Sequence, residues 1–123
     1  MKLILDTHVL LWALAEPERL DDTRRQLIED GSNTVYASSV NAAEIAIKAS
    51  IGKLTFEGDL LALVEEAGFE WIDLCAAEAM RLQALPFHHR DPFDRMLVCQ
   101  SLHRKLPIAT NDAVFEPYGC EVV

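Results

Sequence analysis

The sequence opens on a short apolar run that stops at a carboxylate. Residues 2–6, KLILD, are too few for a helix, and an uninterrupted apolar run of this length is typical of a strand buried in a parallel sheet. The next segment, HVLLWALA, has the length of a helix, and Glu16-Pro17 ends it. The chain is therefore expected to begin with a buried strand that ends at Asp6 and a helix that follows directly.

The same alternation of strand and helix continues along the chain. Glycine, proline and aspartate separate the segments, as helix caps and turns require. Further strands are predicted at 34–38, 69–74 and 107–110, with a possible last strand at 120–123. Further helices are predicted at 21–30, 41–51, 59–67, 76–85 and from Asp91 to about Lys105. This order predicts an α/β fold with a mainly parallel sheet.

Length and composition narrow the class of protein. A chain of 123 residues fits one compact domain, so residues 1–123 are expected to form one. No apolar run approaches the roughly 20 residues that cross a bilayer. The N-terminus lacks the apolar core of about 7 to 15 residues that marks a secretory signal, so a cytoplasmic location is expected. Cys75, Cys99 and Cys120 are widely spaced and odd in number, which predicts buried free thiols without disulfides or a zinc site.

The formal net charge of −9 argues against a general affinity for nucleic acid, because phosphate binding is driven largely by Lys and Arg. The charge is unevenly distributed. Residues 81–105 carry five basic side chains against two acidic ones, while the rest of the chain carries six against eighteen. This segment is therefore the part of the chain best suited to contact phosphates.

Four acidic side chains lie at junctions between predicted strands and helices. Asp6 ends the first strand, Asp112 follows the strand at 107–110, and Glu44 and Asp94 lie close to the starts of helices. Ligands of an α/β sheet gather at the carboxyl ends of its strands. The four carboxylates are therefore expected to meet at one edge of the sheet.

Each of these acids also has an ordinary structural role open to it. Asp6 could cap the helix after it, Asp112 could form a turn, and Glu44 has the capping-box spacing from Asn41. Asp91 is predicted to cap the helix that contains Asp94, with an auxiliary ligand role as the alternative.

Carboxylates brought together repel one another, raise each other's pKa and reduce stability, so such a cluster is normally maintained by a bound cation. Oxygen ligands without His or Cys favour Mg²⁺, with Mn²⁺ as the second choice. Acid-only sites of this kind hydrolyse phosphodiesters. The residues thus predict a metal-dependent phosphodiesterase.

Four segments together resemble the PIN domain, and more narrowly the VapC-like toxins of type II toxin–antitoxin pairs. The segments are LDTHVLLW at 5–12, SSVNAAEIAIK at 38–48, HRDPFDRMLVCQS at 89–101 and ATND at 109–112. They occur in the order of the family and cover essentially the whole chain. The resemblance implies a three-layer α/β/α sandwich and assigns the catalytic and metal-binding positions to Asp6, Glu44, Asp94 and Asp112.

The resemblance further implies an endoribonuclease that blocks translation, forms a homodimer and is neutralised by a cognate antitoxin protein. It also suggests auxiliary roles for four residues, each with local capping or turn bonding as the alternative. These are Asp91, Thr7, Ser38 and Asn111. Arg90 and Arg95 flank the acids and are candidates to hold RNA phosphates, with surface salt bridges as the alternative.

Two other functions compete with a nuclease. A PIN-fold protein-binding module with little or no nuclease activity would keep the fold and the partner surface, but it would not need the four acids. A phosphotransferase that uses Asp6 as its nucleophile, as in the haloacid dehalogenase class, would need a second Asp two positions later, where this chain has His8. We therefore expect the nuclease.

Overall fold

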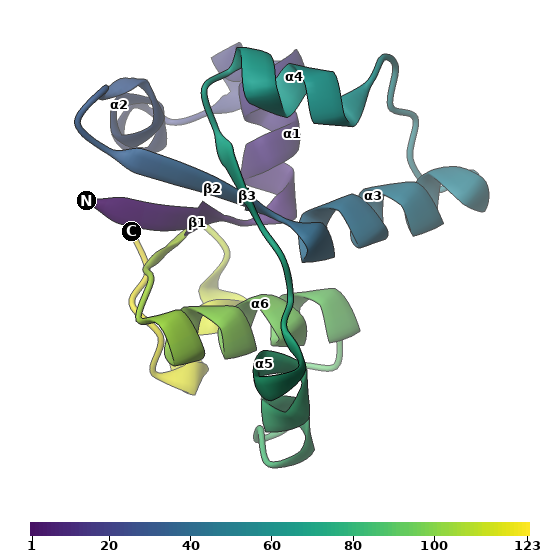
Figure 1. Cartoon of the computed structure of the whole chain (residues 1–123), viewed down its shortest axis with the longest axis vertical. Helices are drawn as coiled ribbons and strands as arrows, with labels where there is room; N and C mark the ends of the chain where they lie inside the picture. The colour runs from purple at the N-terminus through teal and green to yellow at the C-terminus, as the bar shows by residue number, and fades with distance from the viewer.

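The computed structural model describes residues 1–123 and is built on a four-stranded, entirely parallel sheet in the order β3-β2-β1-β4 (Figure 1). The strands are β1 (Lys2–Leu5), β2 (Thr34–Ser38), β3 (Glu70–Ile72) and β4 (Ile108–Ala109). Ile4 of β1 pairs with Tyr36 of β2 on one side and with Ile108 of β4 on the other. The predicted parallel sheet is confirmed, with β1 in its interior.

Helices cover both faces of this sheet. They are α1 (Thr7–Ala15), α2 (Asp22–Glu29), α3 (Ser39–Ser50), α4 (Leu60–Glu66), α5 (Ala76–Met80) and α6 (Pro92–Arg104). Short 3₁₀ turns are η1 (Pro17–Arg19), η2 (Arg81–Gln83) and η3 (Ala113–Tyr118). In Figure 1, α1, α2 and α4 lie on one side of the sheet and α5 and α6 on the other. The expected three-layer α/β/α sandwich is confirmed.

The two faces of β1 serve two separate cores, which explains why its sequence is apolar without alternation. Leu3 and Leu5 pack with α1 and α4 on one side, and Ile4 packs with α6 on the other. All three side chains are fully buried. Burying such a side chain contributes roughly 1.5–3 kcal/mol, so β1 is fixed from both sides and carries Asp6 at its end.

The start of α3 differs from the prediction in a way that matters for the site. The helix begins directly after Ser38, two residues before the predicted start, because Ser38 is the N-cap and Asn41 completes the capping box. The Asn41 side chain accepts a hydrogen bond from Ser38 N at 2.7 Å and donates to Leu5 O at 3.2 Å and to Thr7 Oγ1 at 2.9 Å. This buried amide therefore ties the carboxyl ends of β1 and β2 together.

Smaller differences concern the C-terminal half. The predicted helix at 76–85 ends at Met80 and continues only as the turn η2, and the predicted strand at 120–123 is reduced to a single parallel bridge between Val122 and Ile108. All three cysteines are free, as predicted, but Cys75 is exposed because it lies at the N-terminus of α5 and outside the core. No helix is both long and apolar enough to span a bilayer.

Candidate metal site

Asp6, Glu44, Asp91 and Asp94 lie close enough for their charges to interact. Asp6 follows β1, Glu44 lies in the second turn of α3, and Asp94 lies in the first turn of α6 with Asp91 immediately before that helix. The negative charges of Asp91, Asp6 and Glu44 all raise the pKa of Asp94, after the larger effect of burial. Three elements distant in sequence therefore present their carboxylates to one region.

Asp6 does not cap the helix that follows it. It occupies the N-cap position of α1, but its side chain makes no capping hydrogen bond. Instead, Thr110 Oγ1 donates to Asp6 Oδ2 at 2.8 Å, and both residues are buried. Burial is the main cause of a raised pKa for Asp6, and Glu44 adds to it, while the hydrogen bond from Thr110 opposes it. The capping alternative for Asp6 is therefore wrong.

Glu44 has one paired oxygen and one that is buried without a partner. Lys48 Nζ donates to Oε2 at 2.5 Å, an i to i+4 pair on α3. Oε1 has no hydrogen-bond partner, although the Glu44 side chain is only 5% exposed. The capping box of α3 uses Asn41 as its third residue, so the capping role suggested for Glu44 is also wrong. Leaving a buried acceptor unpaired costs roughly 1–3 kcal/mol, and a ligand bound at Oε1 would remove this cost.

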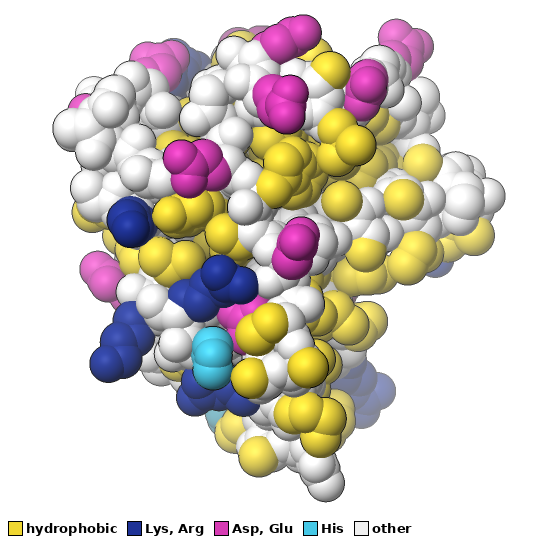
Figure 2. Space-filling view, in the orientation of Figure 1, with side chains coloured by type: hydrophobic (Ala, Val, Ile, Leu, Met, Phe, Trp, Pro, Cys, Tyr) yellow, Lys and Arg dark blue, Asp and Glu magenta, His cyan; other side chains and the backbone are white.

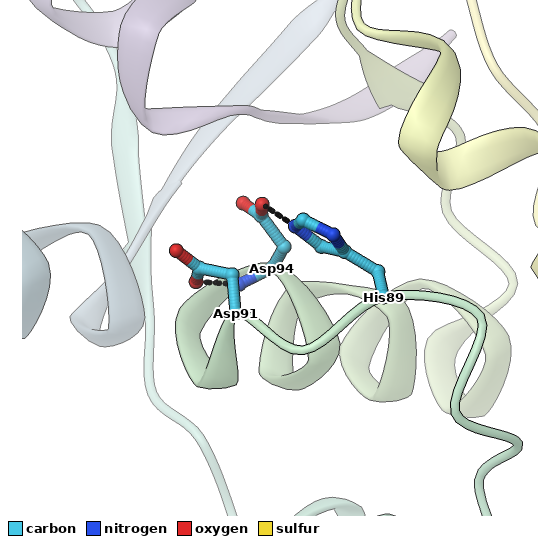
Figure 3. Close-up of side chains that lie close together, drawn as sticks. All are labelled: His89, Asp91 and Asp94. Atoms are coloured by element: carbon cyan, nitrogen blue, oxygen red, sulfur yellow. Dashed lines mark hydrogen bonds and ion pairs between the residues drawn. The ribbon is translucent and has the colours of Figure 1, made fainter.

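His89, Asp91 and Asp94 form the part of the cluster shown in Figure 3. The ring nitrogen Nε2 of His89 lies 2.8 Å from Asp94 Oδ2, and one ligand atom from each of the three residues lies within 4.8 Å of the others. Asp91 Oδ1 accepts hydrogen bonds from Phe93 N at 2.8 Å and Asp94 N at 3.0 Å, which confirms its predicted capping role. Because a carboxylate only accepts, His89 donates to the ionised Asp94.

The pKa of Asp94 is raised from its ordinary value of 3.8 to about 6. Burial is the largest cause, and repulsion from Asp91 comes next; the hydrogen bond to His89 acts in the opposite direction. An acid held at such a pKa by its neighbours stores unfavourable electrostatic energy in the folded protein. A cation among these carboxylates would relieve it.

Asp112 lies at the rim of the cluster and not inside it. It is exposed, and its Oδ1 accepts a hydrogen bond from Val114 N at 3.1 Å. Asp112 therefore caps the turn η3, the structural role that was the alternative to metal binding. It nevertheless shares an open depression of about 520 Å³ with Asp6. The depression is lined by Asp6, His8, Trp12, Arg19, Asn111, Asp112 and Ala113. Asn111, one of the predicted auxiliary residues, thus also lies at this rim.

Two predicted auxiliary residues are engaged inside the fold. Thr7 is buried and accepts the hydrogen bond from Asn41, and the buried Ser38 hydroxyl accepts from Val40 N at 3.0 Å and donates to Gln100 Oε1 at 2.5 Å. Both side chains are thus occupied in holding the strand ends. Ser38 caps α3, as the local-bonding alternative required, whereas Thr7 bonds to a residue 34 positions away. They therefore stabilise the ends of β1 and β2 next to the carboxylates.

The structure contradicts the role expected for Arg95. This side chain is buried, and its guanidinium donates to the carbonyls of Pro86 at 2.7 Å and Leu85 at 3.1 Å and lies 3.3 Å from the Tyr118 hydroxyl. It anchors the loop before α6 and has no donor turned outward to RNA. Arg90, by contrast, is exposed.

Three residues at the site were not predicted: His89, Thr110 and Asn41. The backbone of His89 is fixed by Tyr118, whose hydroxyl accepts from His89 N at 2.8 Å. Tyr118 lies 29 positions away in the sequence, so no local pattern could reveal this contact. Thr110 could more easily have been predicted from the sequence, since it follows β4 directly and lies two residues before the predicted Asp112.

The donor set fits a hard divalent cation. The buried Asp6 and Glu44 and the half-buried Asp94 are each fixed through one oxygen by a neighbouring donor, and Glu44 Oε1 has no partner at all. Carboxylate oxygens favour Mg²⁺ or Mn²⁺. The ring nitrogen Nε2 of His89 is engaged with Asp94, and Lys48 Nζ with Glu44. The cluster can therefore hold a cation and stabilise developing charge on a phosphate.

The sequence matches the model of the PIN domain family over residues 3–119. The chain belongs to the PIN domain family. The resemblance predicted from the four segments is thereby confirmed. A search of curated proteins gives no match.

Solved structures show the same PIN fold. VapBC2 from Rickettsia felis, bound to a DNA fragment from their promoter, gives a TM-score of 0.70 at 16% identity over 99% of this chain and 96% of that one. DNA-bound VapBC from Salmonella typhimurium gives 0.71 at 21% identity with the same coverage. VapBC-5 from Mycobacterium tuberculosis gives 0.58 at 23% identity over 96% and 90%. At these identities the likeness establishes the fold alone.

Replacing Asp94 by Asn should stabilise the metal-free protein at neutral pH. When the pKa of an acid is higher in the folded protein than in the unfolded chain, the protein loses stability as the pH rises between the two pKa values. For Asp94 these are 3.8 in the unfolded chain and about 6 in the folded protein. Relative to Asp94→Asn, the free energy of unfolding of the wild type should thus fall by about 2–3 kcal/mol between pH 4 and 7. Urea unfolding titrations of both proteins in the presence of chelator, across this pH range, measure the difference in the free energy of unfolding.

Asp21→Asn is a control of opposite sign. Hydrogen bonds from Arg24 lower the pKa of Asp21, so its stabilising effect is present above the ordinary pKa and is lost as pH falls. Asp21→Asn should therefore be less stable than the wild type at pH 7. An Asp94→Asn protein that is also less stable at pH 7 would contradict the repulsion inferred at this site.

Proposed function

We propose that the chain is a divalent-metal-dependent endoribonuclease, the toxin of a toxin–antitoxin pair that blocks translation. The observation that carries the proposal is the unpartnered oxygen of Glu44 beside Asp6 and Asp94. A fold can bury a carboxylate in this state when its function requires a ligand there. Membership of the PIN domain family supports a nuclease over other phosphodiesterases.

Asp6, Asp94 and Asp112 would hold Mg²⁺, or Mn²⁺ in its place, with Glu44 as a further ligand or as the group that activates water. When bound, the cation supplies positive charge that polarises the scissile phosphate and favours ionisation of the attacking water. Thr110, Lys48 and His89 each hold one carboxylate oxygen. These donors would orient the opposite oxygens toward the reaction.

Glu44 Oε1 is the free acceptor for a proton of the attacking water. Its other oxygen is held by Lys48, so the carboxylate cannot turn away without losing that pair. Water would attack the phosphorus in line as the bond to the 3′-oxygen breaks, and the departing oxygen takes a proton from solvent. The products are a 5′-phosphate and a 3′-hydroxyl.

Arg90 is the arginine that we propose contacts RNA phosphates next to the acids. It is exposed and lies between His89 and Asp91, both of which belong to the cluster. Arg95 is not part of this proposal, because its guanidinium is buried among carbonyls.

We also propose that a cognate antitoxin binds the chain and that both act in the cytoplasm. Three of the solved structures that share the fold are described as VapBC, and of these the Mycobacterium tuberculosis protein is described as a member of the VapBC family of toxin-antitoxin systems. An acidic protein with a nuclease site would need such a partner to limit damage to cellular RNA.

The purified protein should cleave total RNA in Mg²⁺ and leave it intact in chelator. Asp6→Asn, Glu44→Gln and Asp94→Asn should each reduce the rate by roughly 100- to 1,000-fold, as removal of one element of electrostatic stabilisation does. Mapping the cut ends should give 5′-phosphates. Cleavage that persists in chelator or in Asp94→Asn would contradict the proposal.

Expression in cells separates the nuclease from the protein-binding alternative. The wild type should arrest growth, and Asp6→Asn should not, while both should still bind the antitoxin. Arg81→Ala, at an exposed site on η2, is the matched control and should arrest growth like the wild type. Equal toxicity of the wild type and Asp6→Asn would favour a binding module.

The protein should be a homodimer in solution. Apolar side chains are exposed on α3, directly after it and at the end of α5, including Ile47 at 49%, Ile51 at 60% and Met80 at 66%, and Figure 2 shows apolar atoms gathered over this side. Light scattering should give twice the chain mass of 13.8 kDa, and Ile51→Lys should shift it to the monomer. Leu61→Lys on α4 is the control. A wild-type monomer at tens of micromolar would contradict the proposal.

A further inference from the structure

Two hollows meet beside the acidic cluster, and the same side chains separate them. The depression of about 520 Å³ contains Asp6 and Asp112, and a neighbouring groove of about 350 Å³ runs along α1. Both volumes fall in the range of about 300–1,000 Å³ typical of small-ligand pockets. The residues common to both are His8, Trp12 and Arg19. A ligand strand that leaves the carboxylates on this side must pass these three residues.

Trp12 and Arg19 form a cation–π pair at this boundary. The guanidinium carbon of Arg19 lies 5.0 Å from the centre of the Trp12 ring, and the His8 ring lies 6.0 Å from it on a tilted plane. The Arg19 side chain is 57% exposed and pairs with Glu16 at 3.1 Å, an exposed ion pair that contributes little to stability. The guanidinium thus lies over the ring and remains accessible.

The chemistry of the two hollows differs in a way that suits a nucleotide. The depression is polar, with the two acids and the Asn111 amide, whereas the groove adds Leu11, Leu54 and Phe56. Arg19 is the one Arg or Lys among the residues that line either hollow. Single-stranded RNA is recognised by stacking its bases on aromatic rings and guanidinium planes. The pair offers both kinds of surface.

We infer that Trp12, Arg19 and His8 form a binding subsite for a nucleotide of single-stranded nucleic acid adjoining the scissile phosphate. This inference rests on the proposed nuclease function and adds where the substrate strand lies. Trp12 is six positions after Asp6 along α1, which corresponds to about 9 Å of helix. A nucleotide whose phosphate lies at the carboxylates can therefore place its base on the Trp12–Arg19 pair and direct the strand into the groove.

The two tryptophans of the chain allow a direct binding test. Trp71 lies on β3 and lines neither hollow. In the Trp71→Phe/Asp94→Asn protein, which retains only Trp12 and should not cut RNA, a mixed-sequence single-stranded RNA 12-mer in Mg²⁺ should change the emission saturably. In Trp12→Phe/Asp94→Asn, which retains only Trp71, the same RNA should leave the emission unchanged.

Affinities for a labelled copy of the same RNA, measured by anisotropy in the Asp94→Asn background, test the contribution of each side chain. Trp12→Ala should weaken binding by roughly 5- to 100-fold, as loss of a base-stacking ring does. Trp12→Phe should retain most of the affinity. Because Trp12 is half-buried and its loss can disturb folding, Arg19→Ala is the second variant, and it should weaken binding by roughly 2- to 30-fold.

Arg81→Ala is the matched arginine control and should bind the RNA like its parent. Unchanged Trp12 emission, or an Arg19→Ala protein that binds as tightly as its parent, would overturn the subsite. If the variants fail these binding tests but the wild type, purified in the same way, still cleaves RNA, the subsite alone is wrong. If it neither binds nor cleaves RNA, the proposed function fails first. Loss of antitoxin binding without loss of RNA binding in Arg19→Ala would assign the surface to the protein partner and overturn the inference.

Discussion

Repulsion among carboxylates at the carboxyl edge of the sheet is the constraint on which this site depends. Burial and like charges raise the pKa of Asp94, and one oxygen of Glu44 is buried without a partner. The fold holds the acids in place through three separate donors from three different parts of the chain. The pairs are Thr110 with Asp6, Lys48 with Glu44 and His89 with Asp94. Each donor fixes the orientation of a carboxylate, but together the donors supply too little positive charge to balance the cluster. A divalent cation would supply the missing charge.

The stability of the sandwich is what makes such an arrangement possible. β1 is buried on both faces, and Asn41 connects its end to β2 through hydrogen bonds to Leu5, Thr7 and Ser38. A rigid edge of this kind resists the separation that repulsion would otherwise produce. On the opposite side, Arg95 fixes the loop before α6, so that the first turn of α6 cannot move away from the sheet. Stability gained in the cores thus offsets the electrostatic cost of the site.

Local patterns in the sequence predicted the scaffold and the acids, but not the donors that hold them. Asp6 was predicted because an apolar run ends there, and Asp94 because Asp-Pro opens a helix. The predicted capping box begins three residues too late, at Asn41 and not at Ser38, since Ser38 reads equally well as the last residue of a strand. The role of Arg95 was wrongly predicted and that of His89 was not predicted, because the surroundings of both come partly from residues distant in the chain, including the turn after β4. Exposure and long-range hydrogen bonds are properties of the fold, and no short window of sequence contains them.

The measurement that tests the central claim most directly is anomalous diffraction from crystals grown with Mn²⁺. The account predicts a peak at about 2.0–2.3 Å from carboxylate oxygens of Asp6 and Asp94, the distance of a hard divalent cation from its oxygen ligands. Glu44 Oε1 should turn toward the same ion, directly or through a water. Carboxylates that point away from one another, with no ion among them at millimolar Mn²⁺, would contradict it.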